Sequence, residues 1–77
     1  PGHADQLGTG VHRRAGTKTN TSTADSTVID DGNGNNTALT KDGVTITAAG
    51  KNPVSLTKDG LNNGGNKISN IADGKRY

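Results

Sequence analysis

The sequence predicts a mainly β, elongated fold, and three observations support this class. Short segments alternate β-branched with polar residues, as residues 44–47 do, which is the pattern of half-buried strands. Turn-forming Gly, Asn and Asp recur between these segments. No stretch keeps the i, i+3, i+4, i+7 apolar spacing of an amphipathic helix. We therefore expect strands joined by short turns and no long helix.

The composition gives one copy of the chain few apolar side chains with which to build a core. Only 26% of the 77 residues are hydrophobic, one is aromatic, and Gly, Asn, Ser and Thr make up 36 of them. There is no Cys for a disulfide, and His3 and His12 have no partner at the spacing of a zinc site. Small chains of this kind either oligomerise or remain partly disordered, and the composition permits both.

The charge distribution argues against nucleic acid as a partner. The net charge is +2, from nine basic residues and seven aspartates that are spread along the chain. The basic runs are short, at residues 12–14 and 75–76, and one aromatic residue in the whole chain provides no platform for stacked bases. No apolar run approaches the ~20 residues of a membrane helix. We expect no nucleic acid partner and no membrane contact by this segment.

The chain divides into four parts. Residues 1–36 are a low-complexity N-terminal segment without a definite predicted fold, for which partial disorder, or an origin of the first residues in cloning, remains open. Residues 37–53 are rich in predicted β-structure. Residues 54–74 form a distinct segment that ends at Asp73-Gly74, and residues 75–77 are a C-terminal tail.

A repeat of strand and turn marks the second half of the chain. The sequence from Leu39 to Gly43, LTKDG, recurs unchanged from Leu56 to Gly60, seventeen residues later. Lys-Asp-Gly is turn chemistry, because Gly tolerates positive φ and Asp can bond its own backbone. Strands predicted at 44–47 and 54–57 adjoin the two turns. Such short units cannot bury a face individually and must stack on neighbours.

Residues 54–74 read VSLTKDGLNNGGNKISNIADG and closely resemble the neck motif of trimeric autotransporter adhesins. The string from Gly60 to Ile68, GLNNGGNKI, carries most of the resemblance because it fixes nine consecutive positions. The stretch from Leu39 to Lys51 resembles, more loosely, the β-rich head or connector that often precedes a neck. The resemblance makes residues 37–53 a head or connector segment and residues 54–74 a neck adaptor.

The resemblance implies an intertwined homotrimer, with a β-prism or β-roll-like head or connector that ends in a neck. Members of this family are rod-like homotrimers on the surface of Gram-negative bacteria. Their heads bind host matrix or cells, and their necks join a wide β head to a narrower coiled-coil stalk. For this chain, the resemblance implies a secreted passenger segment, anchored to the outer membrane by a region outside it. The stalk would also lie outside it, since no heptad pattern follows Gly74.

Carried over position by position, the resemblance implies two structural sites. The trimer core would consist of Val54, Leu56, Leu61, Ile68 and Ile71. The neck loop would consist of Asn62, Asn63, Gly64, Gly65 and Asn66. In that loop the glycines would allow a sharp turn and close approach of neighbouring backbones, while the asparagines would satisfy backbone groups. The adhesive residues stay unassigned.

No arrangement of residues indicates catalysis. A nucleophile, a base and an orienting group are not recognisable together, and we expect neither enzymatic activity nor a cofactor. His3 and His12 are expected to be solvated surface residues.

Two binding motifs compete with a purely structural interpretation. Asp31, Asn33, Asn35 and Asp42 match positions 1, 3, 5 and 12 of a calcium-loop template. Position 6 is Asn36 instead of Gly, however, and no helices are predicted on either side, so a solvated turn is the simpler expectation. Residues 12–14 are basic and would suit an anionic glycan such as heparin, more so when repeated in a trimer.

The leading hypothesis is a structural segment of a trimeric autotransporter adhesin at the bacterial cell surface. It would join a β head to a stalk and support attachment to host cells or matrix, as a homotrimer acting in cell adhesion and virulence. Two alternatives remain: a disordered spacer from a repetitive secreted protein, and a small calcium- or glycan-binding module.

Overall fold

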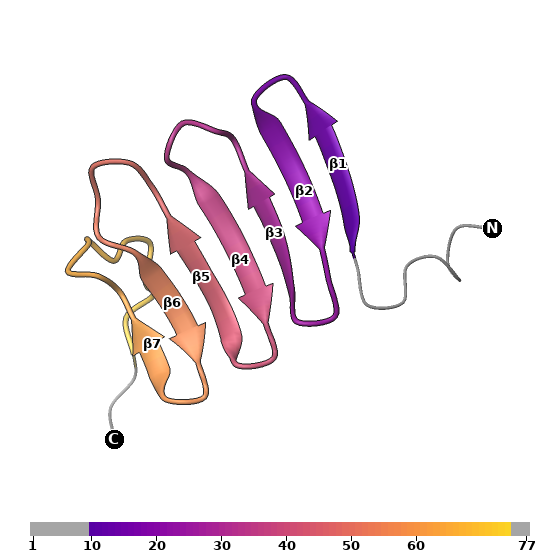
Figure 1. The fold of residues 1–77 in the computed structure, drawn as a ribbon. Coiled ribbons are helices and arrows are strands. Elements are labelled where there is room, and N and C mark those ends of the chain that lie inside the picture. Colours follow the sequence, from indigo (N-terminus) through magenta and orange to yellow (C-terminus); the bar gives the residue numbers. More distant parts are fainter. Residues whose placement is uncertain (1–9, 75–77) are drawn as a thin grey trace.

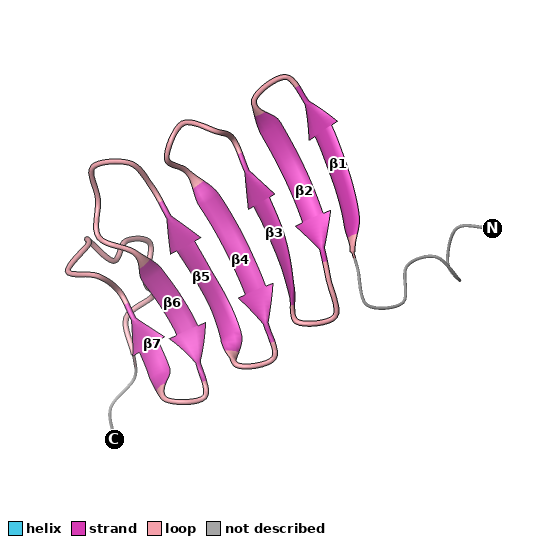
Figure 2. Cartoon of the chain, in the orientation of Figure 1, coloured by secondary structure: helices cyan, strands magenta, loops and turns pink. Residues whose placement is uncertain are grey.

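The computed structural model describes residues 10–74, which form one antiparallel sheet of seven strands. The strands follow one another in space in chain order, each paired with the next, as Figure 1 shows. They are β1 (Val11–Ala15), β2 (Lys18–Ser22), β3 (Ser26–Asp30), β4 (Asn36–Thr40), β5 (Gly43–Thr47), β6 (Val54–Thr57) and β7 (Gly60–Asn62). Within the described residues there is no helix (Figure 2). The mainly β prediction is confirmed.

The strands expected in the second half of the chain are present. Residues 44–47 lie in β5, residues 54–57 form β6, and the Lys-Asp-Gly turns connect β4 to β5 and β6 to β7. The structure adds β1, β2 and β3, which lie in the part of the chain for which the sequence predicts no definite fold. Of these strands, β2 and β3 contain Thr19, Thr21 and Thr27, whose β-branched side chains suit a pleated surface even without apolar character.

The turns that join β2 to β3, β4 to β5 and β6 to β7 repeat one pattern three times. Thr40 accepts a hydrogen bond through Oγ1 from the backbone N–H of Asp42 (3.1 Å), and Thr57 accepts one from Asp59 (3.1 Å). Thr23, another seventeen residues earlier, accepts one from Asp25 (3.2 Å) in the turn between β2 and β3. The shared Thr-x-Asp pattern therefore extends the two-copy sequence repeat to three hairpins with a period of seventeen residues.

The register places almost all large apolar side chains on one face of the sheet. Directly paired residues share a face, and alternate residues along a strand point to the same side. One row runs across the sheet from Val11 through Leu39, Val44 and Leu56 to Leu61. A second row on the same side passes through Ile29, Ile46 and Val54. We call these eight residues the apolar face: Val11, Ile29, Leu39, Val44, Ile46, Val54, Leu56 and Leu61.

The opposite side, here called the polar face, carries mainly Thr, Ser, Asn and charged residues. Its rows include Thr21, Thr45 and Ser55, and only Val28 and Ala38 interrupt them. Such alternation is typical of a sheet with one face packed against a core and the other in water.

No second layer covers the apolar face within the described residues. The molecule extends over 60 × 28 × 18 Å, and the described chain contains no buried residue of any kind. Six apolar-face side chains remain between 41% and 63% exposed. The fold therefore has the amphipathic surface of a packed sheet but, in a single copy, lacks the packing.

Candidate functional site

The apolar face is the most extensive unusual surface of the described chain. It has residues on all strands except β2 and is contiguous from β4 to β7, whereas Ser22 and Thr27 separate Val11 from the rest. Soluble monomers rarely expose a contiguous apolar surface of this kind, and large ones mark interaction sites. Burying each Val, Leu or Ile side chain is worth roughly 1.5–3 kcal/mol relative to leaving it in water. Covering this face is therefore the largest stabilisation open to the fold.

The structure divides the five residues proposed for the trimer core into two groups. Val54, Leu56 and Leu61 lie on the apolar face, and Leu61 pairs directly with Leu56. Ile68 and Ile71 lie beyond β7 in a segment without regular secondary structure, and they are 60% and 70% exposed. The sheet thus aligns the first three side chains and does not bring the last two onto it.

The structure adds five residues to this surface that the sequence does not assign to a core: Val11, Ile29, Leu39, Val44 and Ile46. The alternation of Val44 and Ile46 is visible in the sequence as a half-buried strand. The sequence around Ile29 and Leu39 shows no clear alternation of apolar and polar residues. They are placed on this face by the register alone, which pairs Leu39 with Val44 and aligns Ile29 with Ile46 through Thr37.

The proposed neck loop is fastened to the loop between β5 and β6 by side-chain amides. Asn52 Nδ2 donates to the carbonyl of Gly64 (2.8 Å), and Asn66 Nδ2 donates to the carbonyl of Asn52 (3.3 Å). Asn66 Nδ2 also donates to the carbonyl of Asn63 (2.9 Å), and Asn63 Nδ2 donates to the carbonyl of Asn66. The loop is therefore held both internally and to a segment more than ten residues away in sequence.

Close backbone approach explains the glycine at position 64. Gly64 has φ +65°, and a Cβ atom there would lie 2.4 Å from the carbonyl oxygen of Pro53. No side chain fits at that distance unless the backbone moves. The backbone N–H of Gly64 donates to Asn62 Oδ1 (2.9 Å), and Gly65 follows with φ +75°. Two successive positive φ values turn the chain sharply after β7.

The structure separates Asp42 from the other three residues of the calcium-loop template. Asp31 lies in the loop between β3 and β4, and Asp42 lies at the opposite end of β4 in the next turn. The Asp31 carboxylate instead accepts hydrogen bonds from the backbone N–H groups of Asn33 (2.7 Å) and Asn35 (3.2 Å) and from Asn35 Nδ2 (2.6 Å). Across residues 10–74 no group of three or more His, Cys, Asp or Glu side chains is arranged to hold a metal.

The hydrogen bonds at Asp31 predict a pH-dependent contribution to stability. The Asn35 amide, followed by the Asn33 N–H, lowers the pKa of Asp31 from its ordinary value of 3.8. A native pKa below that of the unfolded chain means that the ionised form stabilises the fold at higher pH, and that this contribution disappears as the pH falls through the lowered pKa. We expect Asp31→Asn to lower the melting temperature above pH ~5 and to make little difference well below 3.8.

The matched control for this prediction is Asp59→Asn. The Asp59 carboxylate accepts no hydrogen bond from the described residues, so its replacement should have a small effect at either pH. Melting curves at several pH values compare the two variants. An Asp31→Asn effect that stays constant from pH 7 to pH 2 would show that the carboxylate charge is not involved.

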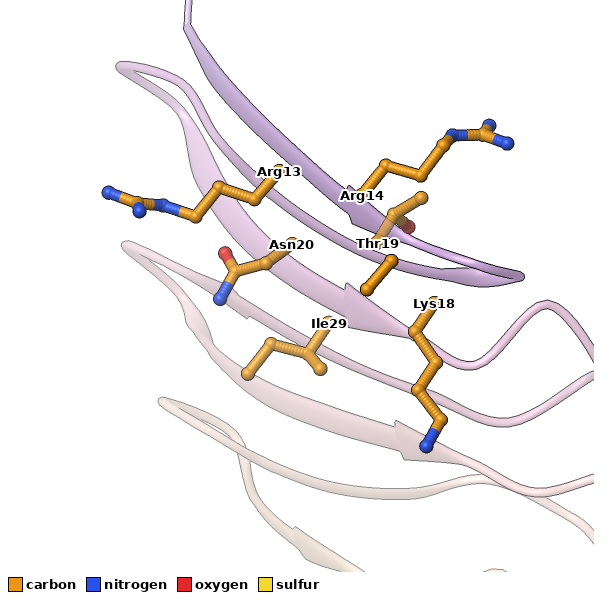
Figure 3. Close-up of a pocket in the computed structure, with 7 residues that line it drawn as sticks. Arg13, Arg14, Lys18, Thr19, Asn20 and Ile29 are labelled. Atoms are coloured by element: carbon orange, nitrogen blue, oxygen red, sulfur yellow. The ribbon is translucent and has the colours of Figure 1, made fainter.

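The basic residues of the N-terminal hairpin point in different directions. Arg13 pairs with Asn20 on the side of the apolar face, whereas Arg14 pairs with Thr19 on the polar face. Figure 3 shows the shallow hollow that Arg13, Arg14 and Lys18 line, with the two guanidinium groups extending away from each other. His12 bonds through Nδ1 to Thr21 Oγ1 (2.7 Å) on the polar face. A single small anion would therefore not contact both guanidinium groups. The other histidine considered in the sequence, His3, lies outside the described residues.

Comparison with protein-family models, with curated proteins and with solved structures found no match to this chain. A search of the described residues also found no helix with the length and apolar character that crossing a membrane requires.

Proposed function

We propose that this chain is a structural segment of a trimeric surface adhesin, in which three copies pack their apolar faces together. The uncovered apolar face is the observation that carries the proposal. A seven-stranded sheet that has eight apolar residues on one side, and no buried residue among those described, gains stability when that side is covered. Copies of the same chain supply a cover of matching shape and polarity.

The number three and the surface location rest on the resemblance of residues 54–74 to an adhesin neck. In this proposal β4 and β5 belong to the head or connector, β6 and β7 belong to the neck, and the chains are intertwined around a common axis. Val54, Leu56 and Leu61 belong to the shared core of the sheet, and Ile68 and Ile71 continue it into the narrower region. The segment holds three chains in register, is displayed outside the outer membrane, and supports attachment to host cells or matrix.

The fastened neck loop supports this role mechanically. An adaptor between a wide head and a narrow stalk must change the direction of the chain at a fixed place. The amides of Asn52 and Asn66 hold the loop at Gly64 against the adjacent loop, so the change of direction is built into each copy. A rigid turn of this kind loses less conformational entropy on assembly than a flexible one.

The test is the absolute mass in solution, measured by light scattering on a sizing column over a tenfold range of protein concentration. A mass near three chains supports the proposal. A monomer with a β-type circular dichroism spectrum and a sharp melt contradicts it, because one copy would then be stable with its apolar face in water. If a monomer gives a coil spectrum, a trimeric coiled coil fused after Gly74 should restore a β spectrum, and failure to do so also contradicts the proposal.

A further inference from the structure

Two Asn-Gly pairs occur in the chain, Asn33-Gly34 and Asn63-Gly64, and the fold places them in opposite chemical situations. Asn-Gly is the dipeptide in which an asparagine side chain is most open to attack by the following backbone nitrogen, because glycine has no side chain in the way. The Gly nitrogen bonds to Asn Cγ, the Cγ–Nδ2 bond breaks, and ammonia leaves with the nitrogen's proton. Water then opens the resulting succinimide to aspartate or isoaspartate.

In Asn33-Gly34, neither reacting group is held by a hydrogen bond to another of the described residues. The pair lies in the loop between β3 and β4, and both residues are exposed. The Asn33 side chain and the Gly34 N–H make no hydrogen bond with any described residue, although the Asn33 N–H donates to Asp31. The side chain can therefore rotate towards the Gly34 nitrogen without losing an interaction that the fold supplies.

Asn63-Gly64 has both reacting groups occupied. The attacking nitrogen of Gly64 donates to Asn62 Oδ1 (2.9 Å), and the leaving nitrogen of Asn63 donates to the carbonyl of Asn66. The backbone around Gly64 is also fixed, since its carbonyl accepts from Asn52. Both residues are partly buried. Reaching the reactive geometry requires at least two hydrogen bonds to break.

From this contrast we infer that Asn33 is a site of spontaneous deamidation in the folded protein and that the fold protects Asn63. The reaction needs only water and adds one negative charge to the β3–β4 loop, next to Asp30 and Asp31. The isoaspartate product also inserts a methylene into the backbone between the Asp31 bonds to Asn33 and Asn35. The inference does not depend on trimer assembly, because this loop connects the ends of β3 and β4 and contributes no residue to the apolar face.

Ageing of the full chain at mildly alkaline pH, followed by peptide mapping with mass spectrometry, tests the inference. In the folded protein, deamidation at Asn33 should be faster than at Asn63 by a factor of about ten or more. The reason is that hydrogen bonds of ordinary strength must first open at Asn63-Gly64. In denaturant the two rates should become similar, because both sites are then plain Asn-Gly. Equal rates in the folded protein, or faster reaction at Asn63, overturn the inference, as does a difference that persists in denaturant.

Asn62→Ala provides the directed variant. It removes the acceptor that occupies the Gly64 nitrogen, so deamidation at Asn63 should accelerate severalfold while the rate at Asn33 stays the same. Asn33→Gln is the companion control, because it should remove the fast acidic product seen on ion exchange. An unchanged Asn63 rate in Asn62→Ala, with the variant shown to be folded by its circular dichroism spectrum, contradicts the protective role assigned to the hydrogen bond.

Discussion

Leu56→Asp is expected to abolish self-association at concentrations where the unmodified chain is trimeric. Leu56 lies near the centre of the densest part of the apolar face, paired with Val44 on one side and Leu61 on the other. In a trimer the substitution places three unpaired carboxylates in one apolar core. An uncompensated buried charge costs about 3 kcal/mol or more per chain, which is about a hundredfold for each chain and about a millionfold in the association constant of the trimer. Light scattering over a range of concentrations measures the shift.

Ser55→Asp is the matched control for this prediction. Ser55 is the immediate neighbour of Leu56 on the same strand, but its side chain lies on the polar face, where it pairs with Thr45 and Asn62. The same charge at this position should leave the mass and the melting temperature nearly unchanged. If both variants remain trimeric, or if both dissociate equally, the apolar face is not the surface that copies of the chain share.

Gly64→Ala is expected to lower stability strongly. The alanine Cβ would lie 2.4 Å from the Pro53 carbonyl oxygen, so the neck loop must move away from the loop between β5 and β6. That movement breaks the Asn52 bond to the Gly64 carbonyl, and the positive φ of +65° adds backbone strain. We expect a loss of about 2–4 kcal/mol, measured as a shift in the thermal or urea midpoint of the full chain.

Gly50→Ala separates steric contact from backbone strain. Gly50 has a similar φ of +77°, but no atom lies within 4 Å of the position that a Cβ would take. Its replacement should therefore cost only the strain of the left-handed conformation, of the order of 1 kcal/mol. Equal losses for the two variants would mean that the approach of Gly64 to Pro53 does not contribute to the stability of the neck loop.

The candidate site was only partly predictable from the sequence. Leu56 and Val54 lie in an alternating strand next to a repeated turn, so the period of two places them on one face, and the resemblance to a neck assigns that face to the trimer core. Ile29 and Leu39 carry no such local signal, because whether they share a face with Ile46 depends on which residues pair across strands. The third copy of the turn, at Thr23 to Ser26, was concealed because Ser replaces Gly and Ala replaces Lys in it.

The sequence by itself determined the mainly β class, the positions of β5 and β6 and their turns, and the shortage of apolar residues for a core in one copy. Periodicity, turn chemistry and composition are local or summed properties, so they can be read along one chain. Only the tertiary structure decided that β1 to β3 extend the same sheet and that eight apolar residues converge on one face. Only the tertiary structure shows, too, that hydrogen bonds with Asn52 hold the neck loop in place. These features depend on the register between strands and on contacts between distant residues, where a shift by one residue would send every side chain to the other face.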